Sequence, residues 1–243
     1  ACLYADVEVT KLLLSNGADV HITCQNQRNA LMFAAEKNSK ESCAICRLLL
    51  SRVPDVESRY AMLSKTDVLG WTPLHFAAKS GSLTQLPWDL LLDGFENSIK
   101  YLPFNAATLD GINLVHLGIW NDRIDVLKLL MEPNSCSPSS SSNHVLESSA
   151  FWRLFKPNQV IPHTAMTELD VALQHEQQAC AFYLARQYHE IDGIPLAFSC
   201  HRLSGSQVLH NLLTQAIAKN DIAAISGILR FETNHINLDY AMI

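Results

Sequence analysis

The stretch from Asp67 to Gly81, DVLGWTPLHFAAKSG, predicts a short helix with clear signals at both ends. Thr72 suits the position just before a helix, because its hydroxyl can accept a hydrogen bond from a free backbone N–H. Pro73 suits the first helical position, where the N–H that it lacks would have no partner. Gly81 suits the end of the helix. The alanines at 77 and 78 are small enough to let a second helix approach closely.

The same stretch resembles the ankyrin repeat, whose signature contains the sequence T-P-L-H-x-A. The matching positions are Asp67, Gly70, Thr72, Pro73, Leu74, His75, Ala77, Ala78 and Gly81. The resemblance implies an all-α solenoid in which helix-turn-helix units of about 33 residues stack in a row. It also places His75 where its ring nitrogens can tie neighbouring loops together.

Further segments align with this unit less closely. Residues 1–20 resemble the back half of a repeat. Four other segments pair a first helix with a second one: 29–35 with 46–50, 111–118 with 126–130, 167–173 with 181–185 and, more weakly, 213–217 with 222–229. Equivalent positions are 33 residues apart at the start of the chain and then 43, 41, 54 and 44 residues apart. The later units therefore carry insertions of 8 to 21 residues over the family period.

Insertions in a solenoid form loops on one face. We expect them at about 53–66, 93–107, 132–162 and 187–206. A second helix of the clearest unit is expected over 83–92, with Pro87 in or near its first turn.

Three segments are expected in order: repeats over 1–131, the first of them truncated; a Ser-rich flexible loop over 132–150; and degenerate repeats continuing the solenoid over 151–243. Ala1 falls inside a first helix, and the last residues are apolar rather than a polar cap. We therefore expect the chain to be a piece of a longer protein.

Composition limits the classes of function. Of the 243 residues, 48% are apolar, which suits a folded protein. The formal net charge of −6 argues against a protein that binds nucleic acid by neutralising phosphates. No uninterrupted apolar run reaches the ~18 residues of a membrane span. The seven irregularly spaced cysteines make a poor disulfide framework, so a reducing, cytoplasmic compartment is expected.

Cysteine and histidine patterns indicate no catalytic, cofactor or metal site. Cys43 and Cys46 form a single C-x-x-C, whereas a zinc site takes four ligands, and Cys46 is expected in the core. Five residues separate His175 from Cys180, a spacing that does not bring two side chains together on one helix. A cysteine-hydrolase-like site in the C-terminal half, using Cys180 or Cys200 with a distant histidine, is the rival interpretation.

The resemblance also implies a binding surface. Ankyrin solenoids bind proteins on a concave face made of hairpin tips and first helices. Matching positions predict that the partner-binding residues are Tyr4, Arg28, Lys37, Leu69, Trp71, Lys79, Ile112, Trp120, Asn121, Met166 and His175. Exposed tryptophan, tyrosine and arginine side chains are typical of interfaces. The alternative is that insertions cover the tryptophans, Trp71 under the 53–66 loop and Trp120 under residues 151–155.

These observations predict a protein-interaction scaffold with no chemistry of its own. The irregular period, polar insertions and unpaired cysteines resemble ankyrin proteins that intracellular bacteria secrete into host cells, so a host protein is one candidate partner. Degenerate animal ankyrin proteins would look similar. A structural spacer that holds two other domains apart is a third interpretation.

Overall fold

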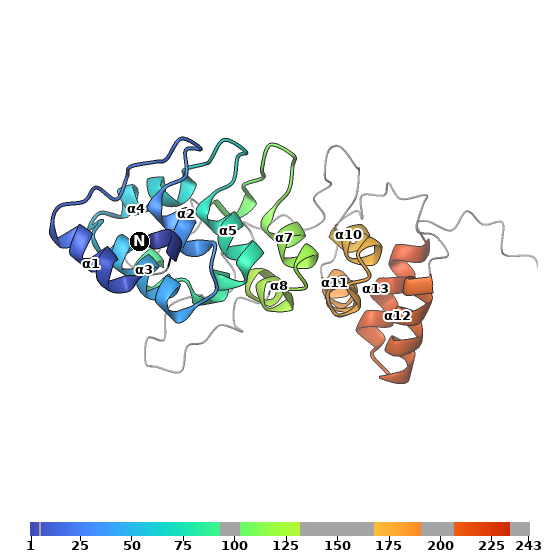
Figure 1. Cartoon of the computed structure of the whole chain (residues 1–243). Coiled ribbons are helices and arrows are strands. Elements are labelled where there is room, and N and C mark those ends of the chain that lie inside the picture. Colours follow the sequence, from blue (N-terminus) through green and yellow to red (C-terminus); the bar gives the residue numbers. More distant parts are fainter. Residues whose placement is uncertain (5, 93–102, 132–167, 191–206, 234–243) are drawn as a thin grey trace, which may run out of the picture.

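The computed structural model describes residues 1–4, 6–92, 103–131, 168–190 and 207–233. Its helices form two rows, and the loops between successive helix pairs project along one edge (Figure 1). The regular structure of the described residues is helical, apart from one isolated bridge between Thr23 and Asn29. This arrangement confirms the all-α solenoid of helix-turn-helix units.

The first helices of successive units stack side by side. They are α2 (Ala30–Ala35), α5 (Pro73–Ser80), α7 (Leu114–Trp120) and α10 (Glu168–Gln174), and each packs against the next (Figure 1). The short 3-10 helix η1 (Cys2–Tyr4) packs on α2 at the start of the row. Small residues in these helices, such as the fully buried Ala34 and Ala77, allow the close approach.

Second helices form the other row. They are α1 (Val7–Ser15), α3 (Lys40–Ser51), α8 (Ile124–Met131) and α11 (Gln178–Glu190). The last pair is α12 (Gln207–Ala218) and α13 (Ile222–Thr233), and α13 packs mainly against α11. The segments that match the repeat weakly in sequence are therefore helical, like those that match it clearly.

Capping residues begin the first helices as the sequence predicts. The Thr72 hydroxyl accepts a hydrogen bond from the His75 N–H, and the Nδ1 of His75 accepts one from the Thr72 N–H at 3.1 Å. Asn113 and His116 make the same reciprocal pair in α7. Gly81 ends α5 in the left-handed conformation, with φ 81°.

The second helix of the clearest unit differs from the expectation. Instead of one helix over 83–92, the chain forms the 3-10 helix η2 (Ser82–Gln85) and then the short helix α6 (Trp88–Leu92). Pro87 lies between them, where its missing N–H and its ring interrupt a helix. The Trp88 indole N–H donates to the Leu83 carbonyl at 3.1 Å and joins the two pieces.

The insertion at 53–66 also differs from the expectation, because most of it is the helix α4 (Val56–Ser64) rather than a loop. Asp55 caps α4 by accepting a hydrogen bond from the Ser58 N–H at 2.7 Å. Arg59 donates to the Val53 carbonyl at 2.6 Å and to the Leu90 carbonyl at 2.8 Å. The insertion is therefore a folded element tied to α6.

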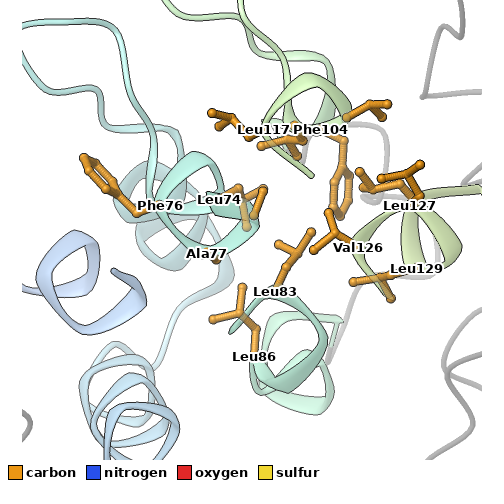
Figure 2. Close-up of a cluster of buried hydrophobic side chains, with 14 of the residues drawn as sticks. Leu74, Phe76, Ala77, Leu83, Leu86, Phe104, Leu117, Val126, Leu127 and Leu129 are labelled. Atoms are coloured by element: carbon orange, nitrogen blue, oxygen red, sulfur yellow. The ribbon is translucent and has the colours of Figure 1, made fainter. Parts of the chain in front are cut away.

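The core between the third and fourth units includes one residue from an insertion. Side chains of α5, η2, α7 and α8 meet there, and Phe104 of the 3-10 helix η4 (Pro103–Asn105) lies among them (Figure 2). Phe104 is almost fully buried and stacks on Trp88 with 5.8 Å between ring centres. Part of the predicted 93–107 loop thus completes the core.

Several expectations concern residues outside the description. The residues outside it include 93–102, 132–167 with the Ser-rich segment 132–150, and 191–206. The proposed division of the chain at residues 131 and 151 therefore stays a prediction. Among the described helices, none is long and apolar enough to cross a membrane.

Candidate partner-binding face

Two hairpins lead into α5 and α7 and have similar internal bonds. The Asp67 carboxylate accepts hydrogen bonds from the N–H groups of Leu69 and Trp71, both at 2.9 Å. In the next hairpin the Thr108 hydroxyl accepts one from the Ile112 N–H at 3.2 Å. These bonds set the direction in which the side chains at the tips leave the backbone.

Backbone hydrogen bonds also join each hairpin tip to the next. The Val68 N–H donates to the Asn26 carbonyl at 3.2 Å, and the Leu109 N–H donates to the Leu69 carbonyl at 3.1 Å. Gly70 permits this approach, since a Cβ there would lie 2.9 Å from the Leu109 nitrogen. The tips therefore form a fixed ladder along one edge of the solenoid.

Three aliphatic side chains gather on this ladder. Val68 is 46%, Leu69 56% and Leu109 74% exposed, and we refer to them as the tip cluster. Their hairpins are directly bonded, so the three belong to neighbouring tips rather than to scattered sites. Adjacent exposed apolar residues of this kind mark interaction surfaces.

Trp71 lies beside the tip cluster and packs on its own unit. Its ring centre is 5.2 Å from that of Phe76 and 6.1 Å from that of His75. The ammonium of Lys79 lies over the indole, 5.5 Å from the ring centre. Trp71 is half-buried, so part of its side chain is accessible to solvent.

Trp120 occupies the position of Lys79 in the next unit. Its ring centre lies 6.5 Å from that of His116 and 6.1 Å from that of the exposed His175. The side chain is half-buried, and its buried indole N–H has no hydrogen-bond partner among the described residues. Residues 151–155, the predicted cover for Trp120, lie outside the description.

Arg28, which the sequence predicts as a partner-binding residue, makes most of its contacts within the protein. Its guanidinium makes two hydrogen bonds to the Glu36 carboxylate, at 3.1 and 3.3 Å, and lies 3.6 Å from the Asp67 carboxylate. It also stacks 3.9 Å from the centre of the Phe76 ring. Only 19% of the side chain is exposed, so Arg28 joins two units and offers little surface to a partner.

The remaining predicted residues are spread unevenly. Lys37 and Asn121 are exposed in the turns after α2 and α7, and Ile112 is half-buried beneath the tips. Tyr4 is exposed on η1, the 3-10 helix that packs on α2. Met166 lies outside the described residues. The structure therefore places Leu69, Trp71 and Lys79 in one unit, with Trp120 in the next unit and His175 in the one after it.

The two buried histidines make hydrogen bonds within the helix caps of their own units. Burial lowers the pKa of His75 to about 4, although the nearby backbone of Ile112 and Ala106 opposes this shift in pKa. Burial likewise lowers the pKa of His116 to about 4. Both rings are neutral at pH 7, and each accepts a hydrogen bond from the first residue of its own capping pair.

Cys46 and Cys180 lack the features of nucleophiles. Burial, with a smaller effect from the neighbouring Asp122 carboxylate, raises the pKa of Cys180 to about 12. Cys46 is buried, as expected, and burial raises its pKa to about 12. Within the described ranges no cluster of histidine, cysteine and acidic residues could hold a metal ion. Cys200, the other candidate nucleophile, lies outside them.

Comparison with known proteins gives one family. Residues 1–100 match the family model described as ankyrin repeats, in three copies. No curated protein matches the chain. Such repeats generally serve as protein–protein interaction modules and typically have no enzymatic activity. The matched segment contains α2 and α5, the hairpin from Asp67 to Trp71 and the insertion helix α4.

Proposed function

Because this chain belongs to the ankyrin-repeat family, we propose that it is a scaffold that binds a partner protein on the ladder of hairpin tips and the adjoining first helices. The observation that carries the proposal is the tip cluster of Val68, Leu69 and Leu109, exposed beside the half-buried Trp71. An aliphatic cluster next to a partly exposed tryptophan resembles the apolar centre of an interface.

The structure favours particular variants for testing this proposal. Trp71 and Trp120 pack against core residues, so truncating them would also disturb the units that carry them. Leu69 and Leu109 are exposed, so the double variant Leu69→Asp/Leu109→Asp should keep the fold while placing two charges in the face. Ile222→Asp is a matched control, since Ile222 is 72% exposed at the start of α13, far along the chain.

The test is affinity capture from a eukaryotic cell lysate followed by mass spectrometry. We expect a protein that the wild type and Ile222→Asp retain and that the double variant loses. Circular dichroism of the three proteins confirms that each is folded. A set of captured proteins that does not change with the double variant would contradict the proposed face.

The cellular setting is a separate part of the proposal. The free cysteines support a reducing compartment such as the cytoplasm. The irregular repeat spacing supports the cytoplasm of a host cell into which a bacterium delivers the protein. A fusion to a reporter that is active only in host cytosol tests delivery. Reporter signal in infected cells supports the effector role, and the absence of signal from bacteria that express the fusion opposes it.

A further inference from the structure

We propose that the partner segment carries an acidic side chain next to aliphatic ones, the acid facing Lys79 and the aliphatic groups resting on the tip cluster. This inference rests on the proposed function and adds the chemistry of the partner. It arises from the distribution of charge over the second and third units.

The carboxylates on this part of the face are already occupied. Both oxygens of Glu36 accept hydrogen bonds from Arg28. One oxygen of Asp67 accepts the hairpin N–H groups, and the other lies 3.6 Å from the Arg28 guanidinium. One arginine thus balances two acids, and neither acid is available to another cation.

Lys79 and Lys37 are left without carboxylate partners. Neither makes an ion pair within the described residues, and both are exposed. Lys79 is therefore an exposed cation beside Trp71 that no carboxylate of the described residues pairs with. Such a cation at the edge of an apolar cluster favours an acidic group on the partner.

Lys79 is also held in place. Its ammonium lies over the Trp71 indole, and Trp71 follows Leu69 by two residues along the same hairpin. A carboxylate that reaches this ammonium lies beside Trp71, so its flanking residues can extend along the hairpin that carries Leu69. A positioned cation at the border of an aliphatic cluster therefore fits an acidic residue followed or preceded by leucine, isoleucine or phenylalanine.

A random peptide library displayed on phage provides the probe. Peptides of about a dozen residues are selected on the wild type, and those that also bind Leu69→Asp/Leu109→Asp are removed. The same selection is run on Lys79→Met, which keeps an apolar stem over Trp71 and loses the charge. We expect aspartate and glutamate beside aliphatic residues in the wild-type pool, and aliphatic residues alone in the Lys79→Met pool.

A synthetic peptide from the wild-type pool gives the magnitude. Lys79→Met should weaken its binding about tenfold or more, and changing the peptide's acid to its amide should have a similar effect. Arg28 stays unchanged throughout, so the fold is preserved. The losses of binding free energy caused by Lys79→Met and by the amide should not be additive, because each change removes the same contact.

The outcomes separate the inference from the proposed function. Two results overturn the inference but still support the binding face. In the first, peptides that depend on Leu69 and Leu109 contain no acidic residues. In the second, peptides selected on Lys79→Met contain as many acidic residues as those selected on the wild type. A library that yields no peptide dependent on Leu69 and Leu109 overturns both. Additive losses in the double change also oppose a direct contact.

Discussion

The guanidinium of Arg123, in the fourth unit, fills the space beside the Cα of Gly81 in the third. A Cβ built on Gly81 would overlap the guanidinium, and Gly81 itself has φ 81°. Arg123 is held there by an ion pair to Asp125 at 3.3 Å. The glycine therefore serves both the turn after α5 and the packing of the next unit.

Replacing Gly81 should cost about as much as replacing another left-handed glycine, because the guanidinium is the far end of a flexible side chain and can move aside. Gly17 is a matched control, because it has φ 82° and open space around its Cα. We expect Gly17→Ala and Gly81→Ala each to lower the free energy of unfolding by about 1 kcal/mol. Urea denaturation measures both values.

The same comparison in an Arg123→Ala background tests the contact. Because the guanidinium can move aside, removing it should leave the cost of Gly81→Ala unchanged. A clear fall in that cost in the Arg123→Ala background would show that the guanidinium is fixed against Gly81.

Stability should fall with acid because of two buried histidines. The pKa of His75 and of His116 is about 4 in the folded protein, against about 6.5 in an unfolded chain. The unfolded state therefore binds more protons between these values. Stability is complete above pH 6.5 and falls until pH 4, by up to about 3 kcal/mol for each histidine.

A double variant, His75→Gln/His116→Gln, separates this effect from the titration of carboxylates. Both proteins are unfolded in urea at pH 7 and pH 5. The wild type should lose more stability between the two pH values than the variant does. Equal losses would mean that the histidines are not the source of the acid sensitivity.

Phe104 should contribute to stability although it belongs to an insertion. It is almost fully buried and stacks on Trp88, so Phe104→Ala leaves a cavity between two units. We expect a loss of about 3–5 kcal/mol in the free energy of unfolding, and a much smaller loss for Phe104→Leu. Similar, small losses for both variants would place the phenylalanine outside the core.

Cysteine labelling distinguishes the scaffold from the hydrolase interpretation. Cys46 and Cys180 are buried, and the pKa of each thiol is about 12, so few thiolates form at pH 7. In the native protein both should react slowly with iodoacetamide, whereas the exposed Cys24 should react sooner. Labelling in urea provides the control for intrinsic reactivity. Fast labelling of native Cys180 would revive the catalytic interpretation.

Local chemistry made much of the fold predictable. Thr72, Pro73 and Gly81 carry the signals that begin and end α5, and the structure confirms each one. The helix over 56–64 was missed, because it lies in an insertion to which the repeat pattern assigns no helix. The sequence did contain a sign of it, since Asp55 is a good capping residue before the apolar Met62 and Leu63.

The candidate face was predictable only in part. Position within the repeat identified Leu69, Trp71 and Lys79, because the tip and the first helix recur in each unit. It could not show that Arg28 is occupied, because one of its acidic partners, Asp67, lies in the next unit. Which charges remain available depends on such contacts between units, and these appear only in three dimensions.

The hydrogen bonds between hairpin tips make the spacing of the tips in space independent of the number of residues between them in the chain. Equivalent residues lie 43 and 41 positions apart around the third unit, yet the tips remain one hydrogen bond apart in space. Residues can therefore be gained or lost behind the tips while the grid of side chains that a partner meets stays constant. Insertions and deletions between the tips can therefore change the rest of the surface, for regulation or for new contacts, while the proposed binding face keeps its arrangement.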